Sequence, residues 1–243
     1  MAVAFLRGFR PHLWPSLIAG AGVLLMLGLG SWQVARLFEK RETNALRAER
    51  LAAAPAPLPA RLDDPARWEF RRVTLRGRFA HERELYLPCR SQHGNDGTCV
   101  LTPLLRDDGG APVLVNRGWV PPPRKDPARR AAGQAAGDAT VEGVLRVAQQ
   151  RSWAMPDNAP ERNVWFWYEL PAMARATGLP LATFYVEAAI DPAAPEGAPL
   201  GGQTRYQLPD NHLGYALTWY ALAIAFAVIY VMSQRQPPET PPA

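Results

Sequence analysis

The sequence predicts a membrane protein of the α+β class, in which two transmembrane helices flank a mostly antiparallel β extramembrane domain with one or two short helices. Three observations predict it. Uncharged apolar runs lie near both ends of the 243-residue chain, between Arg10 and Arg36 and between Asp210 and Arg235. The middle alternates apolar and polar residues with the period of a β-strand. The mean hydropathy of −0.18 is too polar for many spans but allows two.

Each apolar run is long enough to cross a bilayer as a helix, because about twenty residues at ~1.5 Å each span ~30 Å of hydrocarbon. Aromatic residues near the ends suit interfacial anchoring. They are Trp14, Trp32, Tyr215, Trp219, Tyr220 and Tyr230. A cleaved signal peptide is the alternative for the first run, although that run is longer than a usual signal core and lacks a clear A-x-A site. A buried core helix is the alternative for the second.

Two spans place both termini on one side of the membrane. The predicted parts are a cytoplasmic N-terminus (1–14), a first span (15–35), a periplasmic linker helix and β-rich domain (36–210), a second span (211–232) and a cytoplasmic tail (233–243). Arg7 and Arg10 favour a cytoplasmic N-terminus, and long loops cross largely regardless of the basic residues that follow the first span. No transit-peptide-like leader precedes the first span, which favours a bacterial inner (plasma) membrane.

The middle of the chain predicts a small β domain. Residues 32–51 lack Gly and Pro and extend the first span as a charged helix, which the Pro-rich linker 52–59 ends. Strands are predicted at 72–79, 84–87, 98–105, 112–120, 140–147 and 183–190, with a Gly turn joining the third and fourth into a hairpin. Gly178 stops a short helix over 169–177, and 121–138 is predicted to be an exposed, mobile loop. Together these elements indicate an antiparallel sheet or a partial barrel.

Cys89 and Cys99 flank a polar loop and leave three alternatives open. In an oxidising compartment they form a disulfide between neighbouring strands. Otherwise they are free thiols, or they bind a metal together with His93, although their spacing lacks the tight pairs of structural zinc sites.

The soluble part carries little catalytic material. The sequence contains no G-x-S-x-G, H-E-x-x-H, P-loop or dinucleotide-binding glycine motif, which argues against an enzyme. The formal net charge is +5, and no dense basic block occurs in the middle, so nucleic acid is not an expected partner.

The sharper signal lies at the second span. His212, Tyr215 and Trp219 fall at i, i+3 and i+7 and so share a helix face, and Asp210 or Asn211 is positioned to cap that helix. On the first span Trp32 and Arg36 lie near the same outer end. If the helices pack antiparallel, these groups surround one imidazole, which can ligate haem iron, while Arg suits a propionate. Plain interfacial anchoring, with a snorkelling Arg36, is the alternative.

Five blocks of the sequence resemble one known family. They are G-S-W-Q-V-A-R-L-F-E-K at 30–40, V-N-R-G-W-V-P at 115–121, V-E-G at 141–143, N-V-W at 163–165 leading to Met173-Ala174, and N-H-L-G-Y-A-L-T-W-Y at 211–220. Their order and spacing are similar to those of the Surfeit locus protein family of cytochrome c oxidase assembly factors, over about residues 15–232.

The resemblance implies a two-span assembly factor that helps haem a reach the catalytic subunit of a haem–copper oxidase by transient binding, with haem a synthase as a further partner. It implies that His212 is the haem-iron ligand. Arg117 and Trp119 match the central block. Either these residues contact a partner, or the block has a structural role in which Gly118 permits a close turn and Trp119 packs in the domain core. A non-haem scaffold and a tethered periplasmic enzyme or sensor are the alternative functions.

Overall fold

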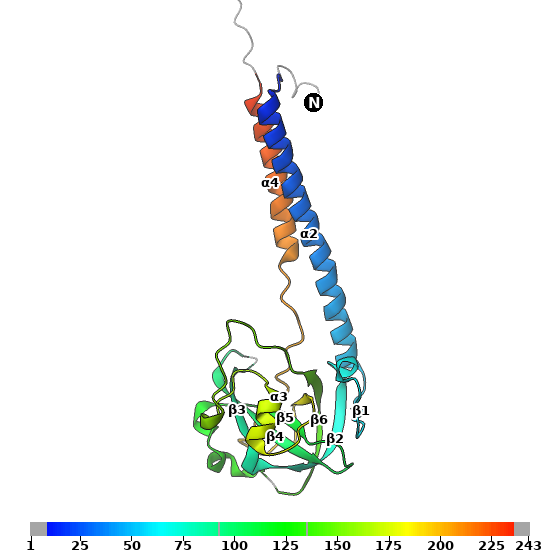
Figure 1. Cartoon of the computed structure of the whole chain (residues 1–243), viewed down its shortest axis with the longest axis vertical. Helices are drawn as coiled ribbons and strands as arrows, with labels where there is room; N and C mark the ends of the chain where they lie inside the picture. The colour runs from blue at the N-terminus through cyan, green and yellow to red at the C-terminus, as the bar shows by residue number, and fades with distance from the viewer. Residues whose placement is uncertain (1–8, 92, 135, 236–243) are drawn as a thin grey trace, which may run out of the picture. The chain divides into compact units, whose positions relative to one another are not determined.

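The computed structural model describes residues 9–91, 93–134 and 136–235. The chain divides into two compact units, which we call the helical unit (up to Leu46 and from Gln207 onward) and the β domain (Arg47–Tyr206). Figure 1 shows both units along the chain.

The helical unit consists of two antiparallel helices. Helix α2 runs without a break over Leu13–Ala52, and α4 covers His212–Ser233. Both are long and apolar enough to cross a membrane, which confirms the predicted two-span class. The charged extension of the first span is also confirmed, because α2 continues to Ala52 and ends where the Pro-rich linker begins.

Small residues let α2 and α4 approach closely. A Cβ atom at Gly22 would lie 2.7 Å from the Phe226 ring, and one at Gly30 would lie 2.7 Å from the Tyr220 ring. The Ser16 and Tyr230 hydroxyl groups are hydrogen-bonded to each other across the pair. Such contacts suit helices in a bilayer, where association depends on packing and interhelical hydrogen bonds.

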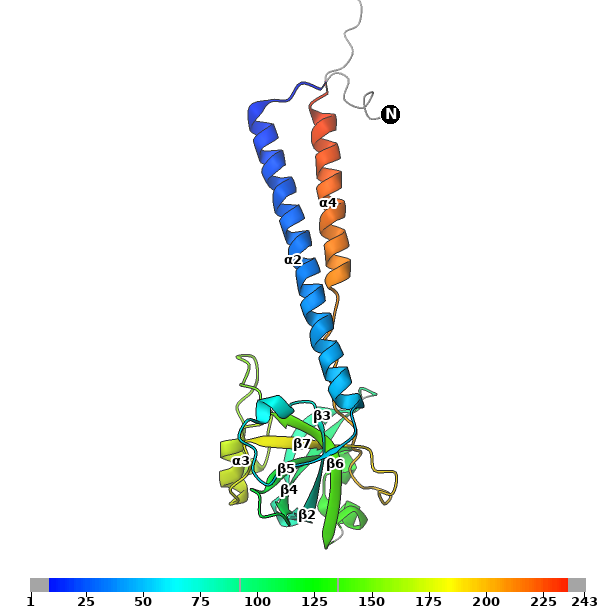
Figure 2. The ribbon, with the colours of Figure 1, turned by 90° about the vertical axis from the view of Figure 1, so that its right-hand side faces the viewer.

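The β domain contains a seven-stranded sheet in the order β1-β2-β6-β7-β5-β4-β3. Its strands are β1 (Ala56–Pro57), β2 (Arg72–Phe79), β3 (Leu85–Arg90), β4 (Asp96–Arg106), β5 (Val113–Val120), β6 (Asp138–Val147) and β7 (Phe184–Ala188). Because β2 also pairs with β4, through Gly77 and Arg106 among others, the sheet closes into a barrel. Figure 2 shows these strands curving around one another.

The barrel encloses an apolar core, and a second cluster packs outside it. The first core gathers Val73, Leu104, Val115, Leu145 and Val186 from different strands. The second cluster joins the sheet to α3 (Leu170–Thr177) and contains Met173 of that helix and Trp165, both fully buried. The alternating residues of each strand therefore fill the interior, as the period-2 pattern predicts.

The sheet also contains two parallel pairings, which the sequence did not predict. β1 pairs with β2 in parallel, and β7 pairs with β5 in parallel. β7 lies between β5 and β6 in the sheet, and it runs antiparallel to β6. The sheet is otherwise antiparallel over the part of the chain that is described, so "mostly antiparallel" holds.

The segment 121–138, predicted to be an exposed, mobile loop, is exposed over most of its described residues, but it is not an irregular coil. It contains the 3-10 helices η3 (Pro122–Arg124) and η4 (Pro127–Gln134), and Arg130 within η4 is buried. The other short helices are η1 (Pro65–Trp68), η2 (His81–Arg83) and η5 (Pro160–Arg162). Arg130 of η4 pairs with Glu84, a tertiary contact that periodicity does not reveal.

Glu84 is the buried carboxylate that holds η4 against the barrel. Its side chain is 2% exposed and that of Arg130 is 0% exposed, and they form a bidentate ion pair. Gln134 and His81 also contact this carboxylate, at 3.3 and 3.5 Å. Burial alone would raise the pKa of Glu84, but hydrogen bonds from His81 and Arg130 and the Arg130 charge outweigh it and lower the pKa to about 2.

Of the three alternatives for the cysteines, the structure shows the disulfide. Cys89 and Cys99 are bonded to each other across β3 and β4, with their Cα atoms 5.7 Å apart. The bond excludes both the free-thiol alternative and a site in which these two thiolates bind a metal with His93.

We predict that Glu84→Gln destabilises the β domain by about 3–5 kcal/mol at neutral pH, because it leaves the buried Arg130 charge unpaired. The Glu84 pKa is lower in the folded state than its ordinary 4.5, so its stabilisation is fully present above pH 4.5 and is lost as the pH falls toward 2. Urea unfolding of the full chain in detergent measures this at pH 7 and at acid pH.

The matched control is Glu142→Gln, which removes a partly exposed ion pair with Arg72 and is expected to cost ~1 kcal/mol or less. Equal losses in the two variants, or a Glu84→Gln deficit that does not shrink in acid, would contradict the assignment.

Candidate functional site

The site at the second span is built around the first residue of α4. The helix begins at His212, with Asn211 at the N-cap position. The Asn211 side chain makes no capping hydrogen bond; instead the Asp210 carboxylate accepts one from the His212 backbone N–H, at 3.2 Å. Asp210 also lies 3.8 Å from the Arg41 guanidinium of α2. Of the two predicted caps, Asn211 occupies the N-cap position without a capping bond, and Asp210 satisfies the first backbone N–H of the helix.

The His212 imidazole is hydrogen-bonded to the first helix. Its Nδ1 atom lies 2.6 Å from Oε1 of Gln33. An amide oxygen only accepts, so Nδ1 carries the hydrogen of this bond. In the neutral imidazole the lone pair is then on Nε2, which is the arrangement of a histidine prepared to ligate a metal, with its other nitrogen donating to a partner.

Gln33 is the residue that sequence reasoning missed. It lies between Trp32 and Arg36 in the sequence, but three residues after Gly30 and four before Leu37, which are both buried. That i, i+3, i+7 spacing places Gln33 on the face of α2 that meets α4. The sequence signal that could have identified Gln33 is its position as a polar residue on the same helix face as a glycine and a leucine.

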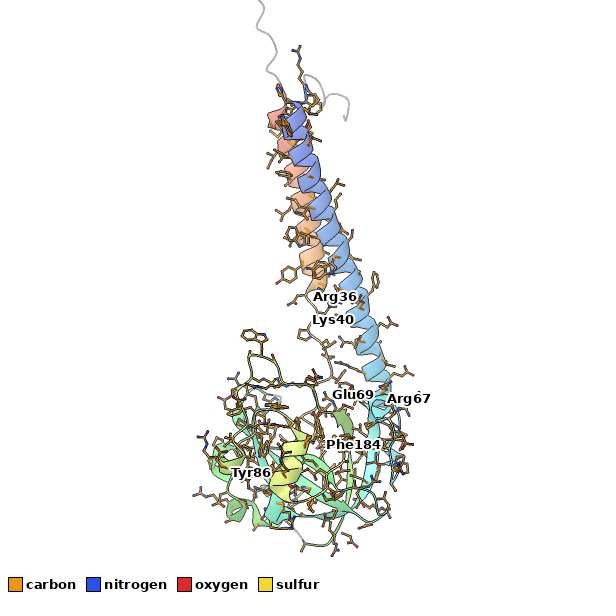
Figure 3. The ribbon with its side chains drawn as sticks, in the orientation of Figure 1. Arg36, Lys40, Arg67, Glu69, Tyr86 and Phe184 are labelled. Carbon is orange, nitrogen blue, oxygen red and sulfur yellow. A yellow bond between two sulfur atoms is a disulfide. The ribbon has the colours of Figure 1, made fainter. Side chains whose placement is uncertain are left out.

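The other predicted groups differ in their exposure and partners. Trp219 is partly buried on the same face of α4 as Ala216 and Ala223, whereas Tyr215 is 57% exposed. Trp32 is 53% exposed, and the Arg36 guanidinium lies 2.6 Å from Glu39 one turn further along α2. Figure 3 labels Arg36 and Lys40, which follow each other along that helix. The helices thus bring Gln33, not Trp32 or Arg36, into hydrogen-bonding contact with His212.

Arg117 belongs to the β domain and is partly buried. Its guanidinium donates to the Gly133 carbonyl at 2.5 Å, lies 4.9 Å from the centre of the Phe79 ring, and is 3.8 Å from Glu84. Burial lowers the pKa of Arg117, and the Glu84 charge opposes this. Arg117 lines a cavity of about 710 Å³ together with Phe79, His81 and Leu200.

Trp119 and Gly118 fix the neighbouring turn. The Trp119 backbone forms a pair of hydrogen bonds with Leu200, at 2.9 and 2.8 Å, and its half-buried indole lies against Gly97. Gly118 has φ +120, and a Cβ there would come 2.0 Å from the Leu200 carbonyl oxygen. The glycine is therefore required by a close approach of two chain segments.

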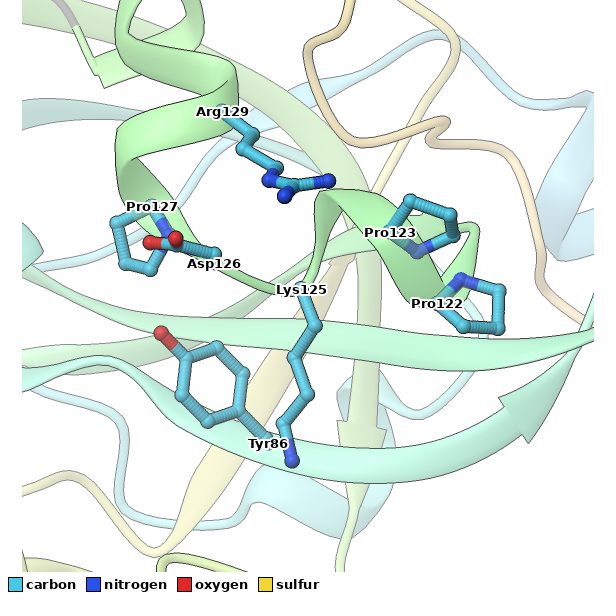
Figure 4. A pocket seen from close by; sticks show the side chains of 7 residues that line it. All are labelled: Tyr86, Pro122, Pro123, Lys125, Asp126, Pro127 and Arg129. Atoms are coloured by element: carbon cyan, nitrogen blue, oxygen red, sulfur yellow. The ribbon is translucent and has the colours of Figure 1, made fainter.

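A second, open pocket lies beside this motif. It has a volume of about 510 Å³ and is lined by Tyr86, Pro122, Pro123, Pro127 and the charged residues around them. Figure 4 shows Lys125 alongside Tyr86, where its Nζ atom is 5.4 Å from the ring centre. Among the residues that the structure describes, no three His, Cys, Asp or Glu side chains converge as a metal site.

Comparisons of the sequence with known proteins identify its family. A model described as "SURF1 family" matches residues 21–224. The chain belongs to the SURF1 family. This confirms the resemblance drawn from the five sequence blocks, and the matched range includes Gln33, Arg117 and His212.

Eukaryotic relatives extend the match over most of the SURF1 chain. The human Surfeit locus protein 1 is 38% identical over 84% of this chain and 72% of its own length. The mouse Surfeit locus protein 1 is 37% identical over 84% and 70%. A SURF1-like protein of Monosiga brevicollis is 34% identical over 88% and 85%. None of these names is that of an enzyme.

We predict that Gly118→Ala destabilises the β domain more than Gly109→Ala does. Both glycines have positive φ, but a Cβ at Gly109 meets open space whereas one at Gly118 meets the Leu200 backbone. Positive φ alone costs an alanine about 1–2 kcal/mol, and the displaced Trp119–Leu200 pairing adds to that at Gly118. Thermal unfolding of the two variants measures the difference, and equal midpoints would contradict it.

Proposed function

We propose that this SURF1 protein is an assembly factor for a haem–copper terminal oxidase, cytochrome c oxidase, and that it aids delivery of haem a to the catalytic subunit by binding haem transiently. His212 holds the haem iron. Haem a synthase is the proposed donor, and the catalytic subunit is the recipient. The protein acts as a chaperone rather than an enzyme.

The observation that carries the proposal is the hydrogen bond between His212 Nδ1 and Gln33 Oε1. The residues present fit a haem ligand, because the bond fixes the ring orientation and leaves Nε2 as the nitrogen that binds iron. If haem bound here, Nε2 of His212 would hold its iron.

The surrounding side chains have separate tasks. The Arg36 guanidinium is suited to a propionate carboxylate, and Trp32, Tyr215 and Trp219 offer flat apolar surface beside the imidazole. A carrier must also release its cargo, so one axial histidine with a labile or open second position suits transfer better than two firm ligands.

The proposed location is the inner (plasma) membrane of a bacterium, which the two helices cross. The termini lie in the cytoplasm, and the β domain lies in the periplasm of a bacterial inner membrane. On this topology His212, which opens the second span, and Trp32, which closes the first, are at the outer interface. There they are accessible both to lipid-embedded haem a and to a membrane subunit.

Replacing His212 by alanine tests the ligand. We expect the full chain, purified from cells that make haem a, to show a Soret band that His212→Ala largely abolishes. His12, which immediately precedes α2, provides the matched control variant His12→Ala, which is expected to retain haem. Unchanged haem content in His212→Ala would refute ligation by this residue.

Replacing Gln33 tests the orienting bond. Second-shell partners of a metal-binding histidine contribute roughly 10–100-fold to affinity, so Gln33→Leu is expected to weaken haem binding by that order. Gln33→Glu, which restores an acceptor, is expected to bind haem again with a changed absorption maximum or midpoint potential. Titration of the purified apoprotein with haem measures both, and wild-type affinity in Gln33→Leu would contradict the orienting role.

A non-haem scaffold is the second candidate, favoured by Arg117, whose partly buried guanidinium lines the 710 Å³ cavity, and by the half-buried indole of Trp119 in the same motif. This function requires that His212→Ala keeps oxidase activity while Arg117→Gln or Trp119→Phe loses co-purification with the oxidase. The haem-transfer function instead requires that His212→Ala loses oxidase activity.

A further inference from the structure

One loop of the β domain presents a tryptophan that the domain leaves uncovered. Trp153 is 95% exposed and Met155 is 41% exposed. They lie in the uncharged run Ser152-Trp153-Ala154-Met155-Pro156, between Arg151 and Asp157. An indole is one of the largest apolar side chains, and tryptophan is enriched at protein interfaces and at membrane–water interfaces.

The loop is preorganised to present this side chain. The Met155 N–H donates to the Ser152 carbonyl at 3.0 Å, which closes a β-turn with Trp153 at its apex. The Arg151 guanidinium donates twice to the Met155 carbonyl, at 3.1 and 2.8 Å, and pairs with Asp157 at 2.7 Å. The turn is therefore neutral and braced, so little ordering entropy opposes its insertion into another phase.

The loop projects from the end of the β domain at which the chain enters and leaves. It follows β6, near whose end the Arg146 guanidinium lies 4.3 Å from the centre of the Phe70 ring. The Arg47 guanidinium lies 4.5 Å from the same ring and donates to the Tyr206 carbonyl. Both views of the ribbon show the loop after β6 rising from the end at which α2 joins the domain (Figures 1 and 2).

This tethered end of the domain also carries three arginines that bond to backbone carbonyls. Arg47, Arg50 and Arg205 donate to the backbone carbonyls of Tyr206, Glu69 and Ser91 respectively. Within the described ranges none of the three forms an ion pair with a carboxylate. An arginine close to an anionic membrane surface contributes about 1 kcal/mol of attraction, so this end complements acidic lipid headgroups.

We propose that the Ser152–Met155 turn is a membrane-contact site of the β domain, which inserts Trp153 into the interfacial layer of the bilayer and brings the arginines of this end to anionic headgroups. The occupant is lipid because both connections from this end lead to membrane spans. The twelve residues from Arg36 to Arg47 extend about 18 Å as helix, and tilting of this helix shortens the distance from the bilayer to the tethered end of the domain. The proposal does not depend on haem binding.

The test places one environment-sensitive NBD label on the full chain in liposomes. Because Cys89 and Cys99 are bonded to each other, Trp153→Cys provides a single reactive thiol. The control is Asp138→Cys, an exposed residue at the opposite end of β6. Emission is recorded with nitroxide-labelled lipid and with aqueous iodide as quenchers, in phosphatidylcholine with and without phosphatidylglycerol.

We expect blue-shifted emission at position 153, with quenching by nitroxide lipid at least roughly twofold stronger than at 138 and increased by phosphatidylglycerol. Equal iodide quenching at both positions, with no quenching by nitroxide lipid, would overturn the proposal. A label at 153 that is shielded from iodide but not quenched by lipid would also overturn it, because protein would then cover the turn.

Discussion

The close antiparallel approach of α2 and α4 is the constraint on which the proposed site depends. At Gly30 the absence of a side chain lets the Tyr220 ring lie against the α2 backbone, and one turn further along α2 the Gln33 amide meets His212. A side chain at Gly30 would push the helices apart there. An amide–imidazole bond of 2.6 Å does not tolerate such a separation. A glycine that touches no ligand therefore sets the geometry of the imidazole.

A buried carboxylate plays the corresponding role in the β domain. Glu84 follows η2 directly and joins it to η4 through Arg130 and to the 115–121 motif through Arg117. Two guanidinium groups thus share one carboxylate, and the second is further satisfied by a backbone carbonyl and an aromatic ring. The arrangement holds a Pro- and Ala-rich segment that has little apolar surface of its own. Charge pairing, rather than hydrophobic burial, shapes the surface beside Arg117 and Trp119.

Much of the fold could be predicted because its signals are local. Uncharged apolar runs define α2 and α4, and alternation defines β2 and β5, so those bounds agree within a few residues. Tertiary pairing carries no such signal. Arg130 lies in a segment without periodicity, and its burial depends on a carboxylate 46 residues earlier. The parallel pairing of β7 follows from its insertion between two strands, and the position of Gln33 follows from which face of α2 meets α4.

The nature of the orienting group bears on how the proposed carrier releases haem. Metal-bound histidines commonly donate to a carboxylate, whose negative charge makes the imidazole a stronger ligand. Here the acceptor is the neutral amide of Gln33, which fixes the ring without adding that charge. His212 is also half-buried at the first turn of its helix rather than deep in the pair. A fixed but weakly activated ligand at an accessible helix end combines selective capture with ready release, which is the balance that haem transfer requires.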